Sequence, residues 1–286
     1  MQFERREKAQ RSIIKTYRSE LWTKFIKAIK DYDLIQDGDK IAVCVSGGKD
    51  SMLMAMLFKE LYLHGKKNFE LAFLSMDPGY SRENFERIRV NADILGIPLE
   101  FFESSIFEIV EKNEKSPCYP CARMRRGALY AHGKALGCNK IALGHHFDDV
   151  IETILMGMLY AGQIQTMMPK LHSTNFPGME LIRPLYLVRE EDIIRWRDYN
   201  DLTFIACACK LTEKLALEAE SNNCLAEPQG PLSSKRAEIK NLIRALRKKN
   251  EFVEANIFKS VENVHVDTVI KWKKDGISHS FLDEYE

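Results

Sequence analysis

Four short runs of apolar residues, separated by stretches of helical length, constrain the fold of this 286-residue chain more than any other feature. The runs are apolar throughout rather than alternating, which is typical of strands buried on both faces of a sheet. Strands that alternate with helices in this way are parallel strands joined by helical crossovers. The sequence therefore predicts a doubly wound, parallel α/β sheet. The runs are IAVCV (41–45), LAFLSM (71–76), LEFFES (99–104) and KIALG (140–144).

Helices are expected between these runs and toward both ends of the chain. Residues 8–30 are predicted to form an amphipathic helix whose apolar face includes Ile14, Leu21 and Phe25. The segment 208–234 has no clear periodicity and is expected to be a surface loop. The other segments expected to be regular are helices at 51–64, 82–95, 122–136, 149–160, 189–200 and 233–250, and a strand at 181–186.

On this basis we divide the chain into three parts. Residues 1–35 hold the N-terminal basic helix, 36–205 the α/β domain, and 206–286 a C-terminal loop and helical region that ends in a polar tail. The net charge is only +1, but 1–30 and 235–249 are locally basic. Local positive charge is compatible with a nucleic-acid partner, and equally with two solvated helix faces.

The sequence also predicts where the protein resides. No apolar run reaches the roughly 18 residues of a membrane-spanning helix. The charged N-terminus MQFERREKAQRS is not followed by the apolar segment of a secretory signal. We therefore expect a cytoplasmic protein that has no membrane association.

The segment SGGKDS (46–51) lies where the first predicted strand ends and a helix begins. In an open parallel sheet, ligands bind beyond the carboxyl ends of the strands. Glycine lets backbone N–H groups approach an anion, and the N-terminus of the following helix attracts negative charge. Lys49 adds a positive charge, the two serines add hydroxyl donors, and Asp50 is a candidate for holding Mg²⁺ or capping the helix. The segment predicts a phosphate-binding loop, against the simpler alternative of a capped tight turn.

The same segment resembles the SGGxDS signature of the PP-loop ATP pyrophosphatases, which cleave ATP into AMP and pyrophosphate. It fits neither the G-x-x-x-x-G-K-S/T template nor the G-x-G-x-x-G template. The resemblance implies that the chain uses ATP. The residues expected to bind the nucleotide are Ser46, Gly47, Gly48, Lys49, Asp50 and Ser51, together with Gly144 and His145.

Cys118 and Cys121 form a C-x-x-C pair, and three arginines follow within five residues. This spacing lets two thiolates share one metal ion or cluster, and the arginines favour thiolate over thiol. A structural zinc site needs four ligands, but the chain has no second C-x-x-C pair. Of the other cysteines, Cys44 and Cys138 are predicted to be core residues. The candidates for a further ligand are Cys207, Cys209 and Cys224.

A second polar segment, GHHFDD (144–149), follows the fourth predicted strand and is expected at the same rim as the phosphate loop. Its paired carboxylates, Asp148 and Asp149, are candidates for holding Mg²⁺ or positioning a substrate. Asp149 and Glu152 also have the spacing of a helix capping box, which is the simpler explanation for one of them. The two histidines are alternatively ordinary polar residues at a strand end.

Two longer segments carry a more specific resemblance. CYPCARMRRGALYAHGKALGCNKIALGHHFDDVIETILMGMLYAGQIQTMMPKL (118–171) and LIRPLYLVREEDI (181–193) resemble the tRNA 2-thiocytidine synthetase family, TtcA. The resemblance runs from about residue 15 to about residue 270, and implies a [4Fe-4S] cluster held by the C-x-x-C pair and one later cysteine. Cys207 matches that cysteine best. The chain departs from the family pattern around 207–224, where extra cysteines and a longer loop occur.

This resemblance implies an activity and its partners. The enzyme would adenylate the 2-oxo group of a cytidine in a tRNA anticodon loop and replace it with sulfur, using ATP, Mg²⁺ and the cluster. A sulfur donor such as a cysteine desulfurase and a homodimer are expected. The alternatives are a tRNA 2-thiouridine synthetase and a non-catalytic nucleotide-binding redox sensor. Arg125 and Arg183 are candidate contacts to phosphate or RNA, and the alternative for either is an ordinary surface charge. The predicted catalytic residues are Lys49, Arg125, Asp148 and Asp149.

Overall fold

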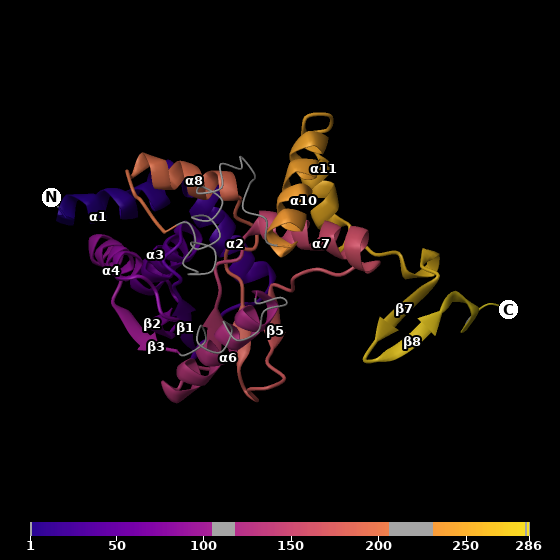
Figure 1. Cartoon of the computed structure of the whole chain (residues 1–286), viewed down its shortest axis with the longest axis horizontal. Helices are drawn as coiled ribbons and strands as arrows, with labels where there is room; N and C mark the ends of the chain where they lie inside the picture. Colours follow the sequence, from indigo (N-terminus) through magenta and orange to yellow (C-terminus); the bar gives the residue numbers. More distant parts are fainter. Residues whose placement is uncertain (1, 105–117, 206–230, 284, 286) are drawn as a thin grey trace, which may run out of the picture. The chain divides into compact units, whose positions relative to one another are not determined.

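The computed structural model describes residues 2–104, 118–205, 231–283 and 285 (Figure 1). It contains two compact units, which we describe separately. The first comprises the described residues of 1–150 and 168–235, and the second those of 151–167 and 236–286. The division of the chain at residues 35 and 205 stays a prediction.

In the described part of the first unit, six strands form one sheet in the order β3-β2-β1-β4-β6-β5. All neighbours are parallel except β5, which pairs antiparallel with β6 at one edge. This arrangement confirms the predicted α/β sheet. The edge strand β5 was not predicted, because Leu171 is its one apolar residue and a Lys and a His flank it, so it lacks the apolar run of a buried strand. The strands are β1 (Lys40–Cys44), β2 (Glu70–Asp77), β3 (Leu99–Glu103), β4 (Lys140–Ala142), β5 (Lys170–His172) and β6 (Glu180–Ile182).

Helices cover both faces of this sheet (Figure 1). Three of them, α3, α4 and α8, lie on one face, and α6 lies on the other. The chain changes face between β3 and β4, so the strand order reverses between β1 and β4. Ligands of such sheets bind in the crevice beyond the carboxyl ends of the strands at that reversal. The helices are α3 (Lys49–His64), α4 (Arg82–Leu95), α6 (Cys118–Ala135) and α8 (Glu190–Tyr199).

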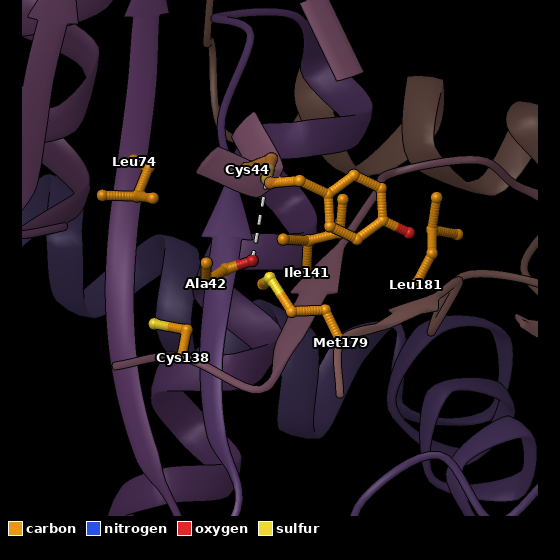
Figure 2. Packing of buried hydrophobic residues seen from close by; sticks show 8 residues of the cluster. Ala42, Cys44, Leu74, Cys138, Ile141, Met179 and Leu181 are labelled. Atoms are coloured by element: carbon orange, nitrogen blue, oxygen red, sulfur yellow. Dashed lines mark hydrogen bonds between the residues drawn. The ribbon is translucent and has the colours of Figure 1, made fainter. Parts of the chain in front are cut away.

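A cluster of apolar side chains packs between α6 and the sheet (Figure 2). Gly133 lets α6 approach closely, because a Cβ at that position would lie only 3.3 Å from the Cβ of Ala42. Cys44 and Cys138 are buried in this cluster, which confirms that both are core residues. The members are Ala42, Cys44, Leu74, Tyr130, Cys138, Ile141, Met179 and Leu181.

The N-terminal segment is not the single helix that was predicted over 8–30. Two π-helical turns separate two α-helices, and each π turn holds more residues than an α turn. The wider turns rotate the apolar face, so Ile13 is buried where Ile14 was expected, whereas Leu21 and Phe25 are buried as predicted. The elements are α1 (Gln2–Arg11), the π turns Ser12–Thr16 and Arg18–Trp22, and α2 (Thr23–Asp31).

The second unit contains most of α7 (Phe147–Ala161) and α10 (Pro231–Arg247), and all of α11 (Val253–Lys259). Here α10 confirms the basic helix predicted over 233–250. The expected polar tail instead contains a hairpin of β7 (Lys271–Lys274) and β8 (Ile277–Ser280). The signal for it was present, because Asp275 and Gly276 form the two-residue Asp-Gly turn that favours a hairpin. No α-helix in the described ranges combines the length and hydropathy that a bilayer crossing requires.

A buried ion cluster fixes the amino end of the sheet, opposite the carboxyl rim. The Lys140 ammonium lies 2.8 Å from the Asp39 carboxylate and 3.1 Å from the Glu180 carboxylate. It also donates a hydrogen bond of 3.1 Å to the carbonyl of Leu34. Lys140 is only 2% exposed, so its charge depends on these partners. The cluster therefore ties the segment between α2 and β1 to strands β4 and β6.

We expect Lys140→Ala to lower the free energy of unfolding by about 3–5 kcal/mol, because it leaves the buried Asp39 carboxylate without its cation and removes one of the two lysines that contact Glu180. Urea denaturation followed by circular dichroism measures this change. The exposed Lys66 offers a control, and Lys66→Ala should stay within about 0.5 kcal/mol of wild type. Equal stability of the two variants would contradict a stabilising role for the cluster.

Burial, with a smaller contribution from neighbouring Cys138, raises the pKa of the Cys44 thiol to about 12. The folded protein should therefore resist alkylation of Cys44 by iodoacetamide at pH 8, whereas the unfolded chain should react readily. Because only the unfolded thiol ionises just above its ordinary pKa of 9.0, this group destabilises the fold as the pH rises from there toward 12. Peptide mass spectrometry measures the labelling, and equal rates in the folded and unfolded chain would contradict the expectation.

Candidate active site

The loop between β1 and α3 is a compact turn at the carboxyl rim. The Ser46 N–H donates to Oγ of Ser51 (3.1 Å), and the Ser51 hydroxyl donates to the carbonyl of Gly48 (3.0 Å). Gly48 is the N-cap residue of α3, and no side chain caps the helix. The first N–H groups of α3 are therefore not used by a side-chain cap at Gly48, and the binding of phosphate by this loop stays a prediction.

Gly47 is required by the backbone and by its neighbours. Its φ of +85° lies in the left-handed region, which side chains disfavour. A Cβ there would also lie 2.4 Å from Cγ1 of Ile88 and 2.8 Å from Cδ1 of Ile205. At Gly48, by contrast, the nearest atoms would be 3.8 Å away. A side chain at Gly47 would therefore clash with α4 and with the segment after α8, whereas a methyl group at Gly48 would fit.

A cavity of about 300 Å³ lies beside this loop, within the first unit. Its volume is near the lower end of the range for small-molecule sites, about 300–1,000 Å³. Side chains from the loop, from α6 and from the segment between β4 and α7 meet around it. The predicted site residues that line it are Ser46, Asp50, Ser51, Arg125, Gly144, His145 and Asp149. Their chemical roles stay predictions.

Gly144 lets two of these segments approach each other closely. A Cβ on Gly144 would lie 3.1 Å from the backbone N and 3.2 Å from Cα of Ser51. Backbone atoms cannot move aside as the end of a side chain can, so a larger residue would push β4 away from the start of α3. The structure thus gives Gly144 a packing role in addition to its place in the cavity wall.

The C-x-x-C pair lies at the start of α6, whose described backbone places Cys118 and Cys121 at its N-terminal end. Because α6 leads down to the amino end of β4, its first turn lies toward the carboxyl rim. Positions 118, 121, 125 and 129 share one helical face. Arg125 and Leu129 line the cavity, so the positions of both cysteines continue the same face.

Cys207, the third predicted ligand, lies outside the described residues, as do Cys209 and Cys224. The described chain reaches Ile205, whose carbonyl oxygen would lie 3.9 Å from a Cβ on Gly48. Just before it, the Nδ2 of Asn91 donates a hydrogen bond of 2.9 Å to the carbonyl of Thr203. The described chain thus runs beside the phosphate loop two residues before Cys207.

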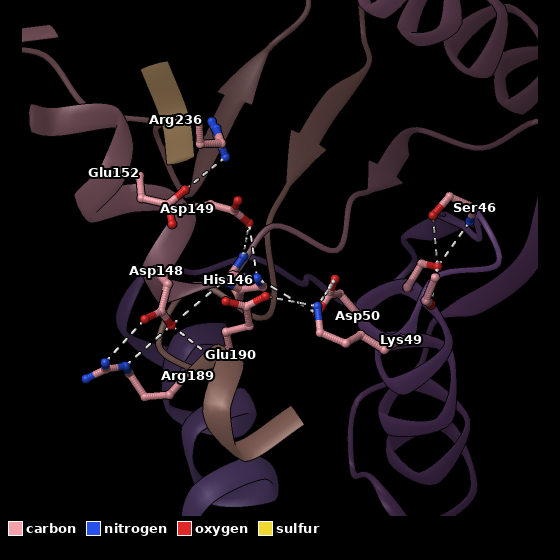
Figure 3. A network of polar contacts seen from close by, with 12 residues as sticks. Ser46, Lys49, Asp50, His146, Asp148, Asp149, Glu152, Arg189, Glu190 and Arg236 are labelled. Carbon is pink, nitrogen blue, oxygen red and sulfur yellow. Dashed lines mark hydrogen bonds and ion pairs between the residues drawn. The ribbon is translucent and has the colours of Figure 1, made fainter. Parts of the chain in front are cut away.

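Lys49 is held by two carboxylates (Figure 3). Its ammonium lies 3.2 Å from Asp50 and 3.2 Å from Oε1 of Glu190. Burial lowers the pKa of Lys49, but the carboxylates of Asp50 and Glu190 outweigh burial and raise it above its usual value. Lys49 is therefore protonated at neutral pH. Sequence reasoning missed Glu190, the first residue of α8.

Asp148 and Asp149 have different environments. Asp148 accepts hydrogen bonds from the Glu190 N–H (2.7 Å) and from the Arg189 guanidinium (3.2 and 3.4 Å). It thereby caps the N-terminus of α8. Asp149 accepts the His146 N–H (3.1 Å) and lines the cavity. The helix α7 starts at Phe147, two residues before the predicted helix at 149–160. Asp149 therefore lies inside the helix and caps the N–H of His146, so it is not the first residue of a capping box with Glu152.

His146 is buried among three carboxylates. One ring nitrogen, Nε2, lies 3.6 Å from Asp149 and 3.8 Å from Asp50, and Nδ1 lies 3.8 Å from Asp148. Asp50 and Asp149 both line the cavity, and carboxylate oxygens are ligands that Mg²⁺ accepts together with substrate phosphates. Among the side chains that the structure describes, no group of three or more His, Cys, Asp or Glu is arranged to hold a metal ion by itself. Asp50 and Asp149 alone are too few to hold an ion, so they fit a Mg²⁺ ion whose other ligands are nucleotide phosphates.

The two arginines singled out in the sequence differ in position. Arg125 lines the cavity, so it is not an ordinary surface charge. Arg183 follows β6 and is 5% exposed, and its guanidinium donates to the carbonyl of Met168. Burial, with a contribution from Arg126, lowers the pKa of Arg183 to about 10. Neither position is that of a solvated surface residue.

We expect Gly47→Ala to destabilise the protein by about 1–3 kcal/mol, because the new Cβ meets Ile88 and Ile205 in a strained backbone conformation. Gly48→Ala is the matched control, since its backbone is extended and its surroundings have room. Thermal unfolding of the two variants measures the difference. If both variants melt like wild type, packing at Gly47 does not hold the loop.

Among known protein families, a PP-loop domain matches residues 17–215 of this chain. A tRNA-cytidine(32) 2-sulfurtransferase from Pelobacter propionicus is 32% identical over 254 residues, covering 88% of each chain. The protein of the same name from Aliivibrio salmonicida is 41% identical over 187 residues, covering 63% of this chain and 60% of that protein.

Among solved structures, the U34-tRNA thiolase NcsA from Methanococcus maripaludis, with its [4Fe-4S] cluster, has the same fold. The TM-score is 0.63 at 22% sequence identity, covering 84% of this chain and 76% of that chain. The extent of the sequence matches shows that the chain belongs to the TtcA family, the PP-loop enzymes named tRNA-cytidine(32) 2-sulfurtransferases, as its motifs predicted.

Proposed function

We propose that this chain is an ATP-dependent tRNA sulfurtransferase that converts a cytidine of the anticodon loop into 2-thiocytidine. The observation that carries the proposal is that one cavity borders two features. These are the phosphate loop and the face of α6 that continues to the C-x-x-C pair. The relatives' name supports cytidine 32 of tRNA as the substrate. Single-stranded loops are also where proteins gain access to RNA bases.

The chemistry requires activation of the base, because oxide is a very poor leaving group. The 2-oxo oxygen of cytosine forms a bond to the α-phosphorus of ATP, and the bond from that phosphorus to pyrophosphate breaks. Sulfur at the sulfide level, as HS⁻, then bonds to C2 of the base and loses its proton, and the C2–O bond breaks to release AMP. If the donor delivers persulfide sulfur, a thiol reductant supplies the two electrons that bring it to this level. In this scheme the phosphate loop must hold the departing pyrophosphate in place.

The residues of the loop suit that task. Ser46, Ser51 and the first N–H groups of α3 would bind phosphate oxygens, and protonated Lys49 would offset their charge. Asp50 and Asp149 would hold Mg²⁺ against the same phosphates, which lowers the barrier by neutralising the charge of the leaving group. Arg125 lines the same cavity from α6 and would contact the α-phosphate or the RNA.

Cys118, Cys121 and Cys207 are the proposed ligands of a [4Fe-4S] cluster. With three protein ligands, one iron of such a cluster would remain available to bind the incoming sulfur. The face shared by 118, 121 and Arg125 supports the first two ligands, and the passage of the chain beside the loop at Ile205 supports Cys207. The cluster of the thiolase with the same fold is compatible with this assignment.

Partners follow from the same proposal. The basic segments 1–30 and 235–249 would attract the phosphates of tRNA, so binding should weaken as salt rises. A cysteine desulfurase as the sulfur donor and a homodimer complete the proposal.

The nucleoside profile of total tRNA tests this function. Deleting the gene should remove 2-thiocytidine, and wild-type protein and the Cys138→Ala control should restore it, whereas Cys118→Ala should not. Cys138 is a matched control because it is a buried core cysteine remote from the C-x-x-C pair in sequence. Loss of a 2-thiouridine instead would favour the alternative thiolase, and an unchanged profile would contradict the proposal.

A further inference from the structure

Glu190 contacts two parts of the site at once. Its side-chain Oε1 lies 3.2 Å from the ammonium of Lys49, in the loop after β1. Its backbone N–H donates a 2.7 Å hydrogen bond to Asp148, in the segment after β4. Glu190 itself follows β6. One residue therefore connects the ends of three strands that are adjacent in the sheet.

The position of Glu190 is fixed by α8. Asp148 caps the helix at Glu190 and also pairs with the preceding Arg189. Further along the helix, Ile193 and Trp196 are fully buried. The Glu190 carboxylate is therefore held from a rigid element rather than from a surface loop. Its side chain is 19% exposed and that of Lys49 is 20% exposed, so the ion pair is mostly shielded from water.

The charge around Lys49 exceeds what one ammonium can balance. Two carboxylates lie 3.2 Å from it, so the group as a whole is negative before any nucleotide arrives. A polyphosphate adds several negative charges at the same place. Asp50 belongs to the phosphate loop itself, whereas Glu190 comes from another element. When phosphates bind, Glu190 is therefore the anion whose contact with Lys49 they replace.

We propose that Glu190 is a positioning residue for the reaction, which holds the Lys49 ammonium toward the loop and releases it to the phosphates of the nucleotide. This inference rests on the proposed function of the loop in binding pyrophosphate. Holding the lysine in advance avoids the entropy cost of ordering it when the substrate binds. The cost of this arrangement is competition between the carboxylate and the phosphates.

Competition between the Glu190 carboxylate and the phosphates predicts that removing this carboxylate strengthens the binding of pyrophosphate. Glu190→Gln keeps the size of the side chain and removes the competing charge, so inorganic pyrophosphate should bind about two- to fivefold more tightly than to wild type. A substitution that merely damaged the fold would weaken binding. Isothermal titration of the full-length protein with pyrophosphate and Mg²⁺ measures the affinity, and thermal unfolding confirms that the variant is folded.

The neighbouring Glu191 provides the matched control. It is exposed in the same first turn of α8, so Glu191→Gln removes an equal charge without removing the Glu190 contact with Lys49. Its pyrophosphate affinity should stay within about twofold of wild type. Unchanged or weaker binding by Glu190→Gln, or an equal gain in Glu191→Gln, would overturn the proposal.

A second set of titrations, on variants that lack Lys49, tests the positioning role separately from the proposed function of the loop. In a Lys49→Ala background, pyrophosphate should bind weakly, and Glu190→Gln should no longer tighten it, because its effect acts through the lysine. If Lys49→Ala binds pyrophosphate like wild type, the phosphate loop assignment fails. If Lys49→Ala weakens binding but Glu190→Gln has the same effect with and without the lysine, only the positioning role fails.

Discussion

The contact between Gly144 and the first turn of α3 is the constraint on which the site depends. A Cβ on residue 144 would lie only 3.1 Å from the backbone N of Ser51, so the chain after β4 approaches the start of α3 with too little room for a side chain at this position. Ser51 and Gly144 both line the cavity, so this close approach forms part of its wall, at the point where the strand order reverses. A larger residue at 144 would push the phosphate loop away from the segment after β4, which carries Asp149.

Residues at the start of α8 contact the charged side chains of the site and determine how those side chains are paired. Because Asp148 caps α8, its carboxylate is directed to Arg189 and the backbone of Glu190 rather than into the cavity. Two neighbouring carboxylates thus acquire different environments, and Asp149 is the one in the cavity wall. The same helix end brings Glu190 to Lys49. The electrostatics of the loop therefore depend on a segment that follows it by more than a hundred residues.

The regular part of the fold could be predicted because its signals are local. Uniformly apolar runs identified the strands β1 to β4, and the glycines and lysine of 46–51 identified the loop between β1 and α3. Elements with weaker local signals were missed. Strand β5 has one apolar residue, Leu171, and so no apolar run, and the π turns of the N-terminal segment displaced burial from Ile14 to Ile13. The C-terminal hairpin did have a local signal in its Asp-Gly turn, although a polar tail was expected there.

The sequence by itself determined the fold class, the phosphate loop and the C-x-x-C pair, because each depends on residues within one strand, turn or helix. Only the tertiary structure decided that Asp149 rather than Asp148 lines the cavity, that Gly144 serves packing, and that Glu190 pairs with Lys49. Lys49 and Glu190 are 141 positions apart, and the local sequence around one contains no signal for the other. Their contact exists because parallel strands bring their carboxyl ends to one rim, which is a property of the whole sheet.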